Sequence, residues 1–213
     1  MRFLKTLGAA IVAAAALAAF VGAGSASATV ICSTEADPCP AGQAWPNGTA
    51  IDFSIPSGSS ASLTDTSGNS LDKCTTSTVE GSISNTGSST DTVTMIILGL
   101  TWGNCTFTTK TVSTGIKFKV HKIPGTKNGT MTSDSQLEVT INTGLFGSCI
   151  YGVATTRDLG QITFGKSNIS LHLNMPAKRF GSNFACPQTA LWTGTYVLTT
   201  PSSTTLSVSE SGS

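Results

Sequence analysis

Hydrophobic residues recur at every second position over many short runs of this sequence, and this alternation limits the fold more than any other feature. In 116–121, Ile, Phe and Val alternate with Lys, Lys and His, and residues 137–141 and 169–175 alternate in the same way. Successive side chains of a β-strand point to opposite faces, so each run predicts a strand with one buried and one solvated face. Residues 92–98 are almost continuously apolar, which predicts a strand at the centre of a sheet.

Weaker runs of the same kind extend the pattern along the chain. They lie at 50–55, 74–84, 105–109, 149–154, 161–164, 195–200 and 204–208. Turn-forming residues interrupt them at roughly regular intervals, and no long segment after position 30 has a clear helical period. We therefore expect an all-β fold of about ten strands, built as one antiparallel β-sandwich of Ig-like or Greek-key type over residues 50–209.

The composition agrees with a β protein and argues against several other classes. The 213 residues include 34 threonines and 28 serines, but only 11% are charged. Globular domains average roughly 25% charged residues, and coiled coils contain more, so the low content of charged residues argues against a coiled coil. A charged disordered tail is also not expected, because 39% of the residues are hydrophobic and the formal net charge is +1. A pI of about 7.6 gives no indication of nucleic-acid binding.

The first 28 residues have the pattern of a secretory signal peptide. Arg2 and Lys5 precede an apolar run at 7–21, and Ala26-Ser27-Ala28 forms a small-residue cleavage site. A membrane anchor is the alternative, but the run is shorter than the roughly 20 residues that span a bilayer. A lipoprotein anchor at Cys32 is a further alternative, but the residues that precede Cys32 do not favour it. We expect residues 1–28 to be removed and the protein to be secreted, with no membrane span afterwards.

Six cysteines follow the expected cleavage site. They are Cys32, Cys39, Cys74, Cys105, Cys149 and Cys186. An even number in a secreted chain predicts three disulfides, for which 15 connectivities exist. We favour pairing in chain order, 32–39, 74–105 and 149–186. A metal site is the alternative, but Cys-x-x-Cys pairs and cysteines close to a histidine are both absent from the sequence.

The first cysteine pair falls in a segment with a different character. Residues 29–49 contain two cysteines, three prolines and little alternation. We expect them to form a disulfide-containing N-terminal loop laid against the sheet. At the other end, residues 210–213 are expected to be a frayed tail.

Candidate catalytic groups are few in this sequence. His121 and His172 lie on the polar faces of predicted strands, where an exposed polar side chain is the simpler interpretation. A hydrolase would need one of them to face a carboxylate and a hydroxyl. The acidic residues are scattered, and only the neighbourhood of Asp65 and Asp72 is a weak candidate for Ca²⁺. We predict no catalytic residues, no cofactor and no metal.

Lysines are concentrated in one stretch of the chain. Five of them lie within residues 110–127. Lys117, Lys119 and His121 share one strand face, which makes them a candidate binding surface for an anionic envelope polymer or an acidic protein. The alternative is that these lysines only prevent strand-to-strand aggregation. The aromatic residues Trp102 and Trp192 are expected in the core, with a carbohydrate-stacking surface as the alternative.

One C-terminal phrase resembles a known group of proteins. It is Cys186-Pro187-Gln188-x-x-x-Trp192-Thr193-Gly194-Thr195-Tyr196-Val197-Leu198-Thr199-Thr200-Pro201. With the alanine-rich leader and the cysteines at 74, 105 and 149, it resembles uncharacterised secreted proteins of high-GC actinobacteria over roughly residues 60–208. The resemblance implies a disulfide-stapled β-sandwich and an extracellular destination. It implies no activity.

These observations predict a secreted, non-enzymatic β module of the extracellular space or cell envelope, with a structural or adhesive role. A ligand-binding protein or inhibitor that presents its loops to a protein or glycan is the first alternative. A small secreted hydrolase is the second.

Overall fold

The structure is a computed structural model that describes residues 29–84, 93–111, 113, 115–164, 169–202 and 205–210. The predicted signal peptide (1–28) and the last three residues of the predicted tail lie outside the described residues. In the described part of the chain, no helix is long or apolar enough to span a bilayer.

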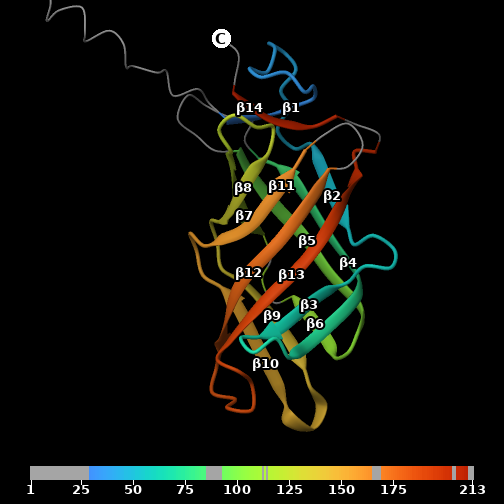
Figure 1. The fold of residues 1–213 in the computed structure, drawn as a ribbon, viewed down its shortest axis with the longest axis vertical. Coiled ribbons are helices and arrows are strands. Elements are labelled where there is room, and N and C mark those ends of the chain that lie inside the picture. The colour runs from blue at the N-terminus through green and yellow to red at the C-terminus, as the bar shows by residue number, and fades with distance from the viewer. Residues whose placement is uncertain are drawn as a thin grey trace, which may run out of the picture.

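The fold is all-β, as predicted, and is organised around four long antiparallel strands that run its length (Figure 1). These strands are β4 (Ser70–Ile83), β5 (Val93–Cys105), β12 (Ser170–Phe180) and β13 (Thr189–Thr200). Shorter strands complete an upper and a lower half. The upper set is β2 (Ala50–Ser54), β7 (Ile116–Lys122), β8 (Gly129–Ser133) and β11 (Asp158–Thr163). The lower set is β3 (Ala61–Asp65), β6 (Thr108–Thr111), β9 (Leu137–Asn142) and β10 (Ser148–Val153).

The upper half is a closed barrel. Each strand pairs antiparallel with the next one in the order β2, β4, β5, β7, β8, β11, β12 and β13. The last strand, β13, pairs with the first, β2. Eight strands therefore form a ring in which each has a partner on both sides. The sequence predicted a sandwich of two open sheets, and the closed ring corrects this prediction. Alternation in the sequence specifies one buried face for each strand, but it does not specify whether the edges of the sheet meet.

The lower half is a second layer of short strands that shares the four long strands. Here β3 replaces β2 between β4 and β13, while β10 extends from β12 and is followed by β9 and β6. Between β5 and β6 the link is made by side chains. The Thr111 hydroxyl donates to the Leu100 carbonyl at 2.9 Å and accepts a hydrogen bond from the Trp102 indole at 3.0 Å.

One hydrophobic core fills both halves. It includes Tyr196 and Met131 in the upper half and Trp192 and Ile141 in the lower half, all at most 4% exposed. Trp192 lies in the core, as predicted, and the partly buried Trp102 packs edge-on against it, with ring centroids 4.4 Å apart. Burial raises the pKa of Tyr196 to about 12, although its hydroxyl donates a hydrogen bond to Ser77 Oγ at 3.1 Å.

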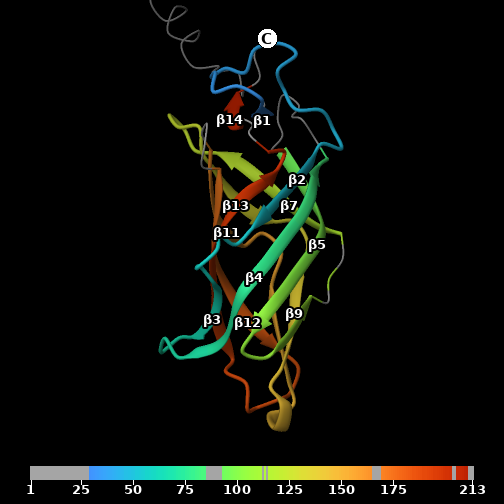
Figure 2. The same ribbon diagram turned by 90° about the vertical axis from the view of Figure 1, so that its right-hand side faces the viewer.

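A separate two-stranded sheet covers the upper end (Figure 2). β1 (Thr29–Cys32) pairs with β14 (Ser207–Glu210), which joins the start and the end of the described chain. Segment 29–49 was expected to be a loop, and the structure shows that it contains a strand. The described residues hold fourteen strands, where the sequence predicted about ten. We call β1, β14 and the loop between Cys32 and Asn47 the cap.

Ion pairs and hydrogen bonds fix the cap to the barrel. Lys122 at the end of β7 contacts Asp37 at 2.5 Å and Glu210 at 3.4 Å, and Lys127 contacts Glu35 at 2.8 Å. Burial alone would raise the pKa of Asp37. Hydrogen bonds from Lys122 and the Glu210 amide, with the charges of both lysines, lower this pKa below its usual 3.8.

Replacing Lys122 with methionine is expected to weaken the cap in a pH-dependent way. A carboxyl whose pKa is lowered by folding adds stability above its unfolded pKa and loses it as the pH falls through its folded pKa. At about pH 6, the free energy of unfolding of the wild type should therefore exceed that of Lys122→Met by up to about 1 kcal/mol. This difference should disappear at a pH below the Asp37 pKa. Denaturant unfolding at both pH values measures this. An equal difference at both would contradict it.

The three disulfides predicted in chain order are confirmed. They are Cys32–Cys39, Cys74–Cys105 and Cys149–Cys186, with Cα–Cα distances of 5.7, 3.9 and 5.8 Å. They stabilise different parts of the molecule. The first lies in the cap, the second joins β4 to β5, and the third joins β10 to the loop that follows β12 at the lower end.

Candidate functional site

The lower end of the molecule consists of two neighbouring loops that we call the tip, residues 143–147 and 181–186 (Figure 1). The first loop connects β9 to β10 and contains the short 3₁₀ turn η1 (Gly144–Phe146). The second follows β12. These loops are the most protruding polypeptide of the lower half in both side views (Figures 1 and 2).

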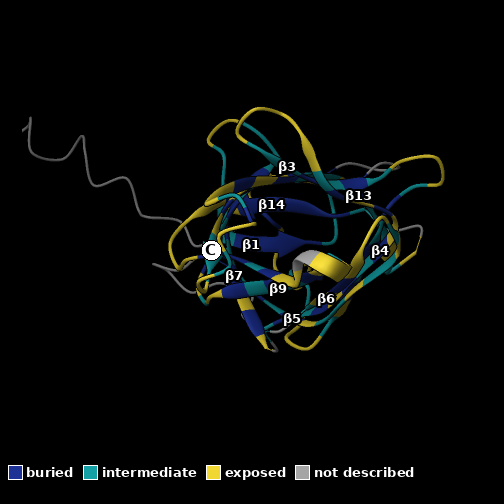
Figure 3. Ribbon diagram, turned by 90° about the horizontal axis from the view of Figure 1, so that it is seen from below, coloured by how far each residue is buried: buried dark blue, intermediate teal, exposed yellow. Residues whose placement is uncertain are grey.

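The first loop is closed by its own hydrogen bonds. The amide and hydroxyl of Thr143 both donate to the Gly147 carbonyl, at 2.9 and 2.7 Å, and the Gly147 amide donates to the Gly144 carbonyl. Gly144 and Gly147 have positive φ values of 69° and 80°, a conformation that glycine adopts without a steric penalty. Leu145 in this turn is fully exposed. Seen from below, the described residues of the η1 turn have the colour of exposed residues (Figure 3).

The second loop is organised around Arg179. Its guanidinium donates to the carbonyl oxygens of Asn183 and Cys186, at 2.7 and 2.5 Å. The Asn183 side chain accepts the Ala185 amide at 3.1 Å and donates to the Ser148 carbonyl at 3.2 Å. These contacts hold the backbone on both sides of Phe184, which is 92% exposed.

The Cys149–Cys186 disulfide joins the start of β10, two residues after the first loop, to the last residue of the second loop. Together with the Asn183–Ser148 hydrogen bond, it fixes the positions of Leu145 and Phe184 relative to each other. A single exposed large apolar side chain is common on a protein surface, but the tip presents two, one on each loop. The tip is therefore a preorganised apolar end on a rigid barrel.

A small pocket of about 180 Å³ lies directly above the tip. Its lining includes Phe107, Leu71, Ile141 and Pro187, and most of it is apolar. The buried Tyr151 forms its inner wall and donates a hydrogen bond to the Pro187 carbonyl at 3.1 Å, while burial raises the pKa of its hydroxyl. The apolar surface of the tip thus continues inward.

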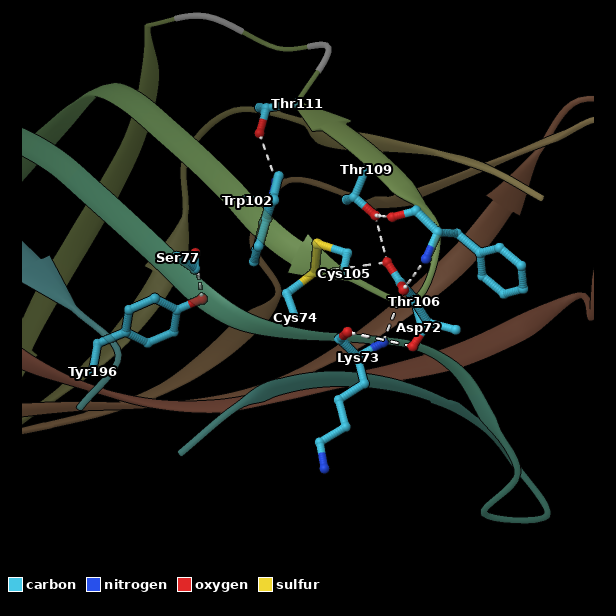
Figure 4. Close-up of a disulfide and its surroundings, with 11 residues drawn as sticks. Asp72, Lys73, Cys74, Ser77, Trp102, Cys105, Thr106, Thr109, Thr111 and Tyr196 are labelled. Carbon is cyan, nitrogen blue, oxygen red and sulfur yellow. Dashed lines mark hydrogen bonds between the residues drawn. A yellow bond between two sulfur atoms is a disulfide. The ribbon is translucent and has the colours of Figure 1, made fainter. Parts of the chain in front are cut away.

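The turn that carries Phe107 is held by a buried carboxylate beside the Cys74–Cys105 disulfide (Figure 4). Asp72 is 1% exposed. It accepts hydrogen bonds from the Phe107 amide at 3.1 Å and from the Thr109 hydroxyl. Asp72 and the two sulfur atoms lie close enough together to suggest a metal site, but both sulfurs are bonded to each other. The Asp72 carboxylate therefore anchors the β5–β6 turn through these hydrogen bonds.

Asp65 and Asp72, the weak candidates for Ca²⁺, are not brought together as ligands. Asp65 accepts hydrogen bonds from Ser67 and from the amide and side chain of Asn69, each at 2.8 Å, in the β3–β4 turn. The Asn69 side chain and amide lower the pKa of Asp65. Asp72 binds the β5–β6 turn instead. Each carboxylate has a local structural role.

The predicted binding surface of Lys117, Lys119 and His121 is partly neutralised. The three side chains share the outer face of β7, as expected. Lys119 forms an ion pair with Asp134 at 3.0 Å. His121 is half-buried, with its Nε2 3.0 Å from the Thr132 hydroxyl. Lys117 is exposed. This face therefore offers one free cation where the sequence predicted a basic stripe.

The two histidines lie apart from each other in hydroxyl-rich surroundings. The exposed His172 ring contacts the hydroxyls of Ser170 and Thr195, at 3.0 and 3.1 Å. It lines a surface groove of about 560 Å³ that also contains Asp158. The Asp158 carboxylate accepts the Gly160 amide at 3.0 Å. Within the described part of the chain, neither histidine has a hydrogen bond to a carboxylate that would orient it as a base.

A cavity in the lower half, next to Trp102 and Trp192, has a volume of about 20 Å³ and an apolar lining. This is roughly the space of one water molecule. Comparisons with family models, with curated proteins and with solved structures found no match for this chain.

Proposed function

We propose that this chain is a secreted, non-enzymatic binding module of the extracellular space or cell envelope, which engages its partner through the tip. The observation that carries the proposal is the exposure of Leu145 and Phe184 on two loops that the Cys149–Cys186 disulfide connects at their bases. Clustered exposed apolar side chains mark interaction surfaces in soluble proteins. This role combines the adhesive module and the loop-presenting binder that the sequence predicted.

The rigidity of the tip supports a binding role. Loops that are ordered before binding lose less conformational entropy when the partner arrives. The disulfide, the Arg179 hydrogen bonds and the internal bonds of loop 143–147 all provide such order. Loops that served only as connections between strands would not each need a large exposed apolar side chain at the lower end of the molecule.

Secretion is supported by the three disulfides, since such bonds persist in oxidising compartments. The predicted signal peptide and the resemblance to secreted actinobacterial proteins belong to the same proposal. A second candidate surface, Lys117 with Lys119 and His121, is less favoured, because Lys119 is already paired with Asp134. A hydrolase site at His172 is less favoured, because among the described residues the His172 ring contacts only hydroxyls and has no hydrogen bond to Asp158 of the same groove.

Binding to isolated cell envelopes from the organism that encodes the chain tests this proposal. The double variant Leu145→Ser, Phe184→Ser should lose at least roughly tenfold in affinity, because each large buried apolar side chain contributes about 1.5–3 kcal/mol. Sedimentation of the purified protein with the envelopes measures the bound fraction. Leu98→Ser is the matched control, because Leu98 is 66% exposed and lies on β5, away from the tip.

Two results would overturn the proposal. In one, the wild-type protein does not sediment with envelopes at any concentration tested. In the other, the tip variant binds as well as wild type. The thermal midpoints of both variants should stay close to that of wild type, because the side chains of Leu98, Leu145 and Phe184 are all exposed.

A further inference from the structure

We propose that the partner of the tip is an anionic lipid surface, with Leu145 and Phe184 entering the interface and nearby lysines contacting the head groups. This inference rests on the proposed function, because it names the partner of the same surface. Peripheral proteins bind such surfaces by combining buried apolar side chains with electrostatic attraction. The tip supplies the first component, and the distribution of lysines in the lower half supplies the second.

Three exposed lysines surround the lower half on different strands. Lys73 lies on β4, Lys110 on β6 and Lys178 on β12. None of them forms an ion pair with another described residue, whereas Lys119, Lys122 and Lys127 of the upper half are all paired with carboxylates. Of the seven described lysines, four have no ion pair. Three of these four lie in the lower half, and the fourth, Lys117, lies on β7 in the upper half.

The formal charge is also asymmetric between the two halves. The strand ends and loops of the lower end, residues 65–74, 102–111, 138–151 and 178–190, contain four basic and three acidic residues. The rest of the chain after residue 28 contains six basic and eight acidic residues. One of the three lower acids, Asp72, is buried and hydrogen-bonded. The surface of the lower end is thus positive on a chain that is otherwise acidic.

The positions of the lysines suit a barrel that stands on its tip. Lys110 is two residues from the lower end of β6, a distance of about 7 Å along the strand. A long lysine side chain covers that distance, so its ammonium group can reach the head groups while Leu145 and Phe184 lie below them. Because the lysines lie on β4, β6 and β12, they surround the tip and do not favour one side.

The test is sedimentation with lipid vesicles, using phosphatidylcholine alone and phosphatidylcholine with about 30% phosphatidylglycerol. Wild type should bind the anionic vesicles at least roughly tenfold more tightly, and added salt should weaken this binding. Leu145→Ser with Phe184→Ser should lose at least tenfold. Each of Lys73→Gln, Lys110→Gln and Lys178→Gln should lose roughly fivefold. Lys117→Gln, an exposed lysine of the upper half, and Leu98→Ser are the controls and should bind as wild type.

The outcomes separate this inference from the proposed function. Tip-dependent binding to envelopes without binding to either type of vesicle would overturn the lipid proposal and leave the proposed function standing, with a protein or polymer as partner. Vesicle binding that does not depend on the tip or on the lower lysines would also overturn it. Tip-dependent self-association in analytical ultracentrifugation, without vesicle binding, would identify a second copy of the chain as the occupant and overturn it too.

Discussion

Replacing Gly160 with alanine is expected to destabilise the barrel by about 2–6 kcal/mol, because two separate costs add. Gly160 has a φ of 135°, a conformation that residues with a side chain rarely adopt. A Cβ atom at this position would lie 1.9 Å from the His172 carbonyl oxygen, which belongs to the backbone of the neighbouring strand. Since backbone atoms cannot rotate away as a side chain does, β11 and β12 would have to separate.

The position of Gly160 explains why the cost is large. Gly160 pairs with Leu173 on one side and with Met131 on the other, at an irregularity in the β8–β11 register. Separation of β11 from β12 would therefore open the ring of eight strands. The measurement is thermal or denaturant unfolding, with an expected fall of the midpoint by roughly 5–20 °C.

Gly125→Ala is the matched control for this prediction. Gly125 also has a positive φ, 73°, but no atom lies within 4 Å of the Cβ position. Its substitution should cost about 1 kcal/mol of backbone strain. If Gly160→Ala is no less stable than Gly125→Ala, close packing of β11 on β12 is not what requires a glycine.

The strands and the disulfides were predictable because both depend on local features of the sequence. Alternation in 169–175 anticipates the burial pattern of β12, where alternate side chains are buried. The disulfide order follows from local topology as well. Cys74 and Cys105 lie opposite each other on β4 and β5, which are consecutive strands of one antiparallel ladder. In a meander of this kind, cysteines close in sequence are also close in space.

Closure of the barrel was not predictable in the same way. It depends on pairs that are distant in sequence, such as β2 with β13, which joins Ser54 to Val197. The cap pairs Thr29 with Glu210 across the whole described chain. Two further strands, β3 and β8, were missed because they consist mostly of small or polar residues and contain only one large apolar residue each, Leu63 and Met131.

The tip was not predicted, because its exposed residues, Leu145 and Phe184, carry no charged or hydrogen-bonding side chain that would mark a site in the sequence. The basic face of β7 was a reasonable candidate from the sequence, but Lys119 meets Asp134, which follows β8, only in the folded barrel. A signal for the tip was present at Leu145, which lies beside another apolar residue between two glycines. Apolar residues inside a glycine-flanked turn cannot join an alternating strand, so such a pair deserved consideration as an exposed surface.

Removing the Cys149–Cys186 disulfide is expected to affect stability and binding together. The bond closes a loop with a sequence separation of 37 residues, and the chain-entropy relation gives a loss of about 4 kcal/mol for Cys149→Ser with Cys186→Ser. The thermal midpoint should fall by roughly 8–16 °C. Because the same bond fixes the two tip loops relative to each other, the folded variant should also bind envelopes and anionic vesicles more weakly than wild type.

The Cys74–Cys105 disulfide provides the control that separates the two effects. It closes a loop of similar length, with a separation of 31 residues, so Cys74→Ser with Cys105→Ser should lose a similar amount of stability. It joins β4 to β5 and does not touch loops 143–147 and 181–186. Binding measured at a temperature where both variants are folded, as judged by near-UV circular dichroism, should therefore fall only when Cys149 and Cys186 are replaced. Equal binding by the two variants would show that the order of the tip does not contribute to recognition.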